Sequence, residues 1–165
     1  MTNPIAIAAL LGILGATPHA AAESQTPPPD MPPSYRTECG SCHVAYPPNL
    51  LAAGGFFSGA GWRTVMDGLN NHFGENAALE EPIHRQIEQY LVDHAASSER
   101  RFSSRTDTPR LTSTLWFHRN HGRVKSYFAD ARIGSPANCQ ACHPRAEEWR
   151  YAKEDVVLPK LPHRN

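Results

Sequence analysis

The sequence predicts a mostly α-helical chain of two small blocks with long loops, and three observations support this prediction. Two runs of residues space their apolar side chains as one face of a helix. The alternation of apolar and polar residues that is typical of strands is nearly absent, apart from Val156 to Leu158. The 165 residues include 15 prolines, which favour loops over long regular elements.

The N-terminal end has the character of an export signal followed by a tether. Ile5 to Leu14 is an apolar stretch too short to span a bilayer, and Ala20 to Ala22 offers a cleavage site of small residues. No Lys or Arg precedes the apolar stretch, which departs from the usual signal. We therefore expect a signal peptide over residues 1–22, a proline-rich extended tether over 23–34, and a periplasmic location.

A first block is predicted over residues 35–96, with two helices over 62–73 and 81–94. Their buried faces consist of apolar residues at helical spacing: Trp62, Val65, Met66, Leu69 and Phe73 in the first, and Ile83, Ile87, Tyr90 and Leu91 in the second. Residues 97–110 are rich in Ser, Thr and Arg and are predicted to form a linker. A second block is predicted over residues 111–165.

The formal net charge is zero, so no overall field points to a nucleic acid or a membrane surface. The charges are nevertheless uneven, because residues 75–98 are mainly acidic and residues 100–132 mainly basic. The basic run could dock an acidic partner through electrostatic steering, or it could simply be a solvated surface.

All four cysteines lie in two Cys-x-x-Cys-His units, Cys39 to His43 and Cys139 to His143. The two thiols of such a unit are spaced to add to the vinyl groups of haem, and the adjacent histidine then ligates the iron. Cys-x-x-Cys pairs also occur in zinc sites, as disulfides and as redox-active dithiols. A histidine directly after both pairs favours covalent haem, which would also compensate for a small apolar core.

The second axial ligand of each iron has to come from elsewhere in the chain. Methionine is scarce after the signal: Met31 lies in the proline tether, and Met66 falls on the apolar face of a predicted helix. Histidine is plentiful, so we expect His72 to close the first site because it ends the 62–73 helix near the buried face. His84 and His94 are expected to face solvent.

For the second site His118 and His121 compete, because residues three apart share one side of a helix. Gly122 would allow a close approach to a porphyrin edge, which favours His121. The neighbouring Arg119 and Arg123 could pair with haem propionates or be solvated arginines.

These motifs resemble the dihaem cytochrome c family of exported bacterial electron carriers. The resembling stretches, in chain order, are Glu38 to Pro48, Trp62 to Gly74, Trp116 to His121 and Ser135 to Pro144. The resemblance implies two haem c groups, each with two histidine ligands, and it points to His72 and His121 as the distal ones. It also implies an N-terminal block similar to class I cytochrome c, with histidine replacing the methionine ligand.

The resemblance implies that the protein passes electrons between redox partners: in this family, a membrane b-type cytochrome and a small oxygen-binding cytochrome similar to class I. Two histidines on each iron leave no position for a substrate, so the expected function is electron transfer and not catalysis. The alternatives are a haem enzyme or a gas-binding protein, and either one requires an open position on one iron.

Overall fold

The computed structural model describes residues 26–49, 58–95 and 109–160. The predicted signal peptide, and the predicted linker up to residue 108, lie outside these ranges. Four α-helices occur in the described residues: α1 (Pro33–Gly40), α2 (Gly59–Asp67), α3 (Ile83–Asp93) and α4 (Leu115–His121). Six 3-10 turns also occur in the described residues, two of them between helices and four after α4: Leu69–Asn71, Leu111–Ser113, Gly122–Ala129, Cys139–Ala141, Ala146–Glu148 and Lys153–Asp155.

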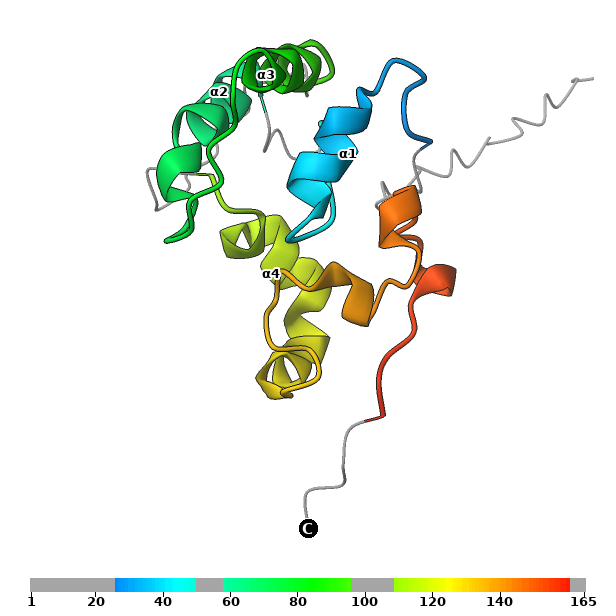
Figure 1. Cartoon of the computed structure of the whole chain (residues 1–165). Helices are drawn as coiled ribbons and strands as arrows, with labels where there is room; N and C mark the ends of the chain where they lie inside the picture. Colours follow the sequence, from blue (N-terminus) through cyan, green and yellow to red (C-terminus); the bar gives the residue numbers. More distant parts are fainter. Residues whose placement is uncertain (1–25, 50–57, 96–108, 161–165) are drawn as a thin grey trace, which may run out of the picture.

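The expectation of a mostly helical chain is confirmed. The only strand-like pairing within the described ranges is an isolated bridge between His72 and Glu75. Figure 1 shows α2 and α3 side by side at one end of the molecule, with α1 between this pair and the 3-10 turns near the C-terminal end. Helix α4 begins the half of the molecule that contains the second motif.

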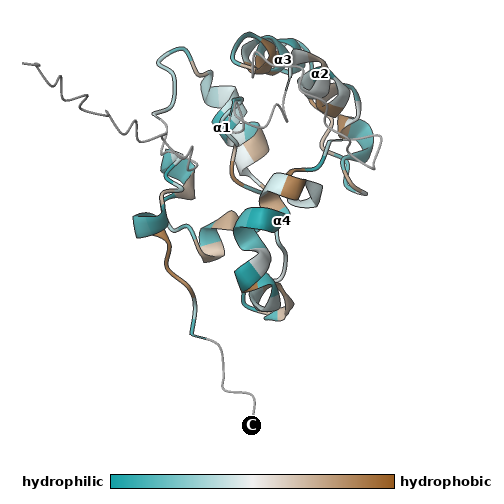
Figure 2. Ribbon diagram, turned by 180° about the vertical axis from the view of Figure 1, so that it is seen from behind, coloured by the Kyte–Doolittle hydropathy of each residue, from teal (hydrophilic) through white to brown (hydrophobic). Residues whose placement is uncertain are grey.

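Helices α2 and α3 are both amphipathic, and Figure 2 shows hydrophobic and hydrophilic residues on each of them. Ser58 begins α2, because its hydroxyl accepts a hydrogen bond from the N–H of Gly61 at 3.2 Å. The apolar faces of the two helices form the core: Trp62, Val65, Met66, Ile87, Tyr90 and Leu91. Burial of each large side chain of this kind contributes about 1.5–3 kcal/mol.

The predicted 62–73 helix is shorter than expected. Helix α2 ends at Asp67, since the N–H of Gly68 turns back to the carbonyl of Val65, and a 3-10 turn follows. The backbone then leaves the helical path, so Phe73 is 42% exposed and does not belong to the buried face. The prediction for Phe73 was therefore wrong, whereas Met66 is a core residue as expected.

His84 and His94 do not face solvent as predicted, because both are half-buried and have partners. The His84 Nε2 lies 3.2 Å from the carbonyl oxygen of Met66, which connects α3 to α2. The His94 Nε2 lies 3.2 Å from a carboxylate oxygen of Asp30, and Met31 packs against the core. The predicted tether is thus anchored on α3 over its last residues.

The buried cluster contains residues of both predicted blocks. Tyr35 of α1 and Ala45 contribute from the first block, and Leu111 and Trp149 contribute from the second. The indole N–H of Trp149 donates to the carbonyl of Ala45 at 2.7 Å, across 104 residues of sequence. The two halves of the chain therefore share one core at this contact.

Candidate functional site

The first Cys-x-x-Cys-His unit begins in the last turn of α1. Pro33 suits the first turn of this helix, and Tyr35 is buried, which fixes the helix against the core. Cys39 is half-buried and Cys42 is exposed in the turn that follows. The Nδ1 of His43 lies 2.8 Å from the carbonyl oxygen of Val44. Since a carbonyl can only accept, Nδ1 carries the proton and Nε2 is left free to bind a metal.

His72 is placed opposite His43 by a tight turn. Its N–H donates to the carbonyl of Glu75 at 2.7 Å, and the N–H of Glu75 donates back at 3.2 Å. The turn needs positive φ at Phe73 (55°) and at Gly74 (99°), a conformation that glycine adopts without strain. The two histidine rings lie 6.2 Å apart, centre to centre, with 30° between their planes.

The second unit starts in the 3-10 turn Cys139–Ala141. The N–H of His143 donates to the carbonyl of Cys139 at 2.8 Å, which folds the histidine back over the first cysteine. The carbonyl of Cys142 accepts a hydrogen bond from the N–H of Val157 at 2.8 Å. This bond holds the predicted β segment, Val156 to Leu158, which is an extended stretch of backbone. Figure 2 shows this stretch as hydrophobic, although Val157 is 62% exposed.

His121 is the histidine that faces the second unit. It ends α4, stacks on Phe117 at 4.1 Å with 15° between the rings, and its Nδ1 lies 3.1 Å from the carbonyl oxygen of Phe117. Its ring centre is 6.2 Å from that of His143, with 68° between the planes. His118 is exposed and makes an edge contact with Phe117 at 6.2 Å. The structure thus brings His121 to the second unit and leaves His118 on the surface.

Within each histidine pair, the two rings are at a separation that fits binding to one iron. Two imidazoles on one metal ion lie roughly 6–6.5 Å apart, centre to centre, for metal–nitrogen bonds of about 2.0 Å and about 1.1 Å from nitrogen to ring centre. Both pairs measure 6.2 Å. The Nδ1 atoms of His72 and His143 are buried and have no hydrogen-bond partner in the described structure. Such polar atoms are costly unless the ring has a further function.

Burial also keeps three of these imidazoles, those of His72, His121 and His143, in the form that binds metal. It lowers the pKa of His72, with smaller contributions from the neighbouring His43 and Arg110. Burial likewise lowers the pKa of His121, and it lowers that of His143 together with the effect of His121. A lowered pKa favours the neutral ring, whose free nitrogen is a ligand.

The thiols do not fit the alternative uses of a Cys-x-x-Cys pair. Burial raises the pKa of Cys39 to about 12 and also raises the pKa of Cys139 and of Cys142, whereas redox-active dithiols need a lowered pKa. No disulfide joins the four cysteines, all of which lie in the described residues. No group of three or more His, Cys, Asp or Glu side chains that could hold a metal ion occurs in the described part of the chain.

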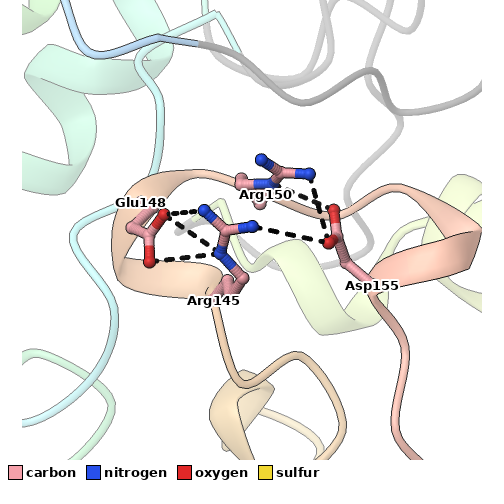
Figure 3. A network of polar contacts seen from close by, with 4 residues as sticks. All are labelled: Arg145, Glu148, Arg150 and Asp155. Atoms are coloured by element: carbon pink, nitrogen blue, oxygen red, sulfur yellow. Dashed lines mark hydrogen bonds and ion pairs between the residues drawn. The ribbon is translucent and has the colours of Figure 1, made fainter.

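An ion-pair network holds the segment after the second unit (Figure 3). Arg145 contacts Glu148 and lies 3.9 Å from Asp155, and Arg150 contacts Asp155 at 3.1 Å. Arg145 and Glu148 are exposed, whereas the side chain of Asp155 is largely buried and is contacted by both arginines. This segment includes Trp149 in the left-handed conformation at φ 58°, where its side chain is buried.

The comparisons with known proteins agree with this geometry. Residues 35–151 match the family model described as dihaem cytochrome c. The chain belongs to the dihaem cytochrome c family. This member accordingly has two haem c groups with iron, and its chemistry is haem-based electron transfer. No helix in the described ranges is long and apolar enough to cross a membrane.

Solved structures of dihaem cytochromes c are similar over most of the chain. A structure from Shewanella baltica has 34% identity and a TM-score of 0.62, covering 77% of this chain and 92% of its own. Two structures from Rhodobacter sphaeroides have 36% and 37% identity and TM-scores of 0.58 and 0.59. They cover 73% and 74% of this chain, and 97% and 98% of their own chains. No curated protein matches this dihaem cytochrome.

Three residues of the site were missed by the sequence reasoning. Phe117 supports His121, Trp149 joins the two halves of the chain, and Tyr46 stacks on His43 at 5.2 Å. Tyr46 and Trp149 each follow a Cys-x-x-Cys-His unit within a few residues, which is a usable signal. Tyr46 is three residues after His43 and contacts its ring, whereas Trp149 contacts the backbone at Ala45.

Proposed function

We propose that this protein is a periplasmic electron carrier in which each iron is held by two histidines. His43 and His72 would bind the first iron, and His143 and His121 the second. Cys39 and Cys42 would form the thioethers of the first haem, and Cys139 and Cys142 those of the second. The observation that carries this proposal is the equal separation of the two histidine pairs, 6.2 Å in each case.

Bound haem supplies a one-electron ferric–ferrous couple. His43 and His72 would hold one iron and His143 and His121 the other, so neither small molecules nor water would have a free coordination site. The carbonyl contacts at Nδ1 of His43 and His121 fix the orientation of these rings, and the stack on Phe117 fixes His121 further. Ligands that do not move when the iron is reduced keep the reorganisation energy small, and a small reorganisation energy favours electron transfer.

The proposed partners are other redox proteins: a membrane b-type cytochrome and a small cytochrome of the class I type. Arg119, Arg123 and Lys125 are exposed on α4 and the 3-10 turn after it, and residues 115–129 contain no acidic residue. An uncompensated cationic surface beside His121 would steer an acidic redox protein toward the second haem.

The proposal is tested by the visible spectrum of the fully reduced dihaem protein with and without carbon monoxide. Closed sites predict a low-spin spectrum that carbon monoxide leaves unchanged. A rapid spectral shift at one haem would show an accessible iron, and the enzyme or gas-binding function would then replace the electron-carrier proposal.

A further inference from the structure

The surroundings of the distal histidine ring differ between the two sites. At the second site His121 stacks on Phe117, which is 5% exposed and itself stacks on Phe128 at 5.9 Å. At the first site the Phe73 ring lies 4.7 Å from the His72 ring, centre to centre, with 60° between their planes. Phe73 is 42% exposed, and a charged side chain lies over its ring. One distal histidine therefore packs on a buried apolar pair, and the other packs on an exposed ring that is covered by a cation.

The cation is the guanidinium of Arg110. Its central carbon, Cζ, lies 4.0 Å from the centre of the Phe73 ring, a distance at which the face of an aromatic ring attracts a cation. The guanidinium is therefore no farther from the His72 ring than this distance and the 4.7 Å between the Phe73 and His72 rings taken together. Arg110 belongs to the second half of the chain, so tertiary structure brings its charge to the first site.

Both members of this stack are held by their backbone. Leu111, the residue after Arg110, is buried in the core. Phe73 lies in the turn that the hydrogen bonds between His72 and Glu75 close. The ion pairs of the described residues do not include Arg110, so no described carboxylate pairs with its charge. The first site thus has an uncompensated positive charge in a defined place beside its distal histidine.

We propose that Arg110 raises the midpoint potential of the first haem by holding a positive charge beside the distal ligand. This inference rests on the proposed function, in which His72 binds the first iron. A ferric haem carries one more positive charge than a ferrous haem, so a fixed cation nearby disfavours the ferric state. Charge and the groups around the axial ligands are among the features that set a haem potential. Phe73 is the positioning residue, because its ring fixes where the guanidinium lies.

The test is a redox titration of the dihaem protein and its variants, followed by electron paramagnetic resonance of the low-spin ferric signals. The signal of the first haem is the one that changes in His72→Ala. We expect Arg110→Gln to lower the potential of this haem, with a fall of about threefold to tenfold in its equilibrium constant for reduction; tenfold corresponds to about 59 mV for one electron. Arg110→Lys keeps the charge and should stay closer to the wild type.

Two further variants separate a charge effect from packing. Phe73→Leu removes the ring that holds the guanidinium, so it should lower the same potential by less than Arg110→Gln does. Arg85 is the matched control, an exposed arginine on α3 that pairs with Glu81 at 3.2 Å, and Arg85→Gln should leave the potential of the first haem as in the wild type.

Ionic strength gives a readout that a packing role would not move. Salt screens an exposed charge, so the difference in potential between the wild type and Arg110→Gln should shrink as salt is added. A difference that salt leaves constant would show that packing and not charge is responsible.

An unchanged potential in Arg110→Gln, or an equal shift in Arg85→Gln, would overturn the proposal. Phe73→Leu decides the matter where Arg110→Gln fails to fold, because an unchanged potential of the first haem in that variant would also contradict it. Failure of the proposed function has a different signature, which is binding of carbon monoxide to the wild-type protein. Low-spin spectra that carbon monoxide leaves unchanged, in the wild type and in each variant, assign a shift in potential to Arg110 and not to loss of a ligand.

Discussion

The two histidine pairs reach the same separation by different routes. His72 sits in a tight turn beyond the end of α2, whereas His121 is the last residue of α4 and is stacked on Phe117. The ring centres are 6.2 Å apart in both pairs, yet the planes meet at 30° in the first and 68° in the second. The separation is the same in both pairs, while the ring angle differs with the element that carries each distal histidine.

This difference separates what each site depends on. The first site depends on backbone conformation, because Phe73 and Gly74 both have positive φ after His72. The second site depends on helix α4, which begins at Thr114. Within this helix the ring of Phe117 stacks on His121 and orients it. Changes to the backbone should therefore affect the first site, and changes to helix side chains should affect the second.

Removal of a distal histidine is expected to have the largest effect. His72→Ala should open the first iron and His121→Ala the second, so that the reduced spectrum of each variant shifts with carbon monoxide at one haem only. His118→Ala is the matched control on the same helix and should behave as the wild type, because His118 is exposed. An open site in His118→Ala and a closed one in His121→Ala would reverse the assignment.

The glycines after the two distal histidines should respond in opposite directions. Gly74 has φ 99°, so Gly74→Ala should reduce the free energy of unfolding by about 1–2 kcal/mol through backbone strain. Gly122 has φ −57°, so Gly122→Ala should stabilise by about 0.4–1 kcal/mol. No atom of the described residues lies within 4 Å of a Cβ at either position.

Chemical denaturation of the two glycine variants measures both effects. A destabilised Gly122→Ala would contradict the expectation. It would instead favour the close approach of a porphyrin edge that the sequence suggested for this residue.

Removal of the two helix caps should reduce the free energy of unfolding, by more at Thr114 than at Ser58. Thr114 is buried, accepts from the N–H of Phe117 at 2.9 Å and donates to the carbonyl of Leu111 at 2.8 Å, so Thr114→Ala should cost about 1–2 kcal/mol. Ser58 accepts from Gly61 at 3.2 Å, and Ser58→Ala should cost about 0.5–1 kcal/mol. The measurement is denaturant unfolding of both variants. Equal losses in the free energy of unfolding would show that burial of the cap does not increase its contribution to stability.

The contact between Asp130 and Arg132, which lies before the second unit, should have the smallest effect on the stability of the fold. Hydrogen bonds from the side chain and backbone of Arg132 lower the pKa of Asp130 to about 2. In the unfolded chain its pKa is about 4. The contact therefore stabilises the fold above about pH 4 and is lost as the pH falls through about 2.

The measurement for Asp130 is the unfolding midpoint of the wild type and of Asp130→Asn across this pH range. Their difference should shrink toward acid. A constant difference would show that the contact with Arg132 does not depend on the carboxylate charge.

The sequence predicted the parts of the site that follow from local spacing. The two Cys-x-x-Cys-His units, the helical class and the core position of Met66 needed only motif and periodicity. The preference for His121 over His118 rested on Gly122, and the structure places His121 at the second unit for another reason, the stack on Phe117.

Other features could not be read from spacing because they depend on tertiary contacts. Phe73 left the buried face because the turn that presents His72 forces its backbone into positive φ. His84 and His94 look exposed on a helical projection, but the neighbouring α2 and the segment at Asp30 cover them. The contact of Trp149 with Ala45 joins residues too far apart for any local pattern to show.

The central claim is that each iron is held by two histidines, in two different geometries. It is tested most directly by the electron paramagnetic resonance spectrum of the fully oxidised dihaem protein, because the angle between the axial ring planes sets the anisotropy of a low-spin ferric haem. The angles of 30° and 68° predict two distinct low-spin signals of equal intensity, with the greater anisotropy at the second haem. A high-spin signal, or one signal for both haems, would contradict the account.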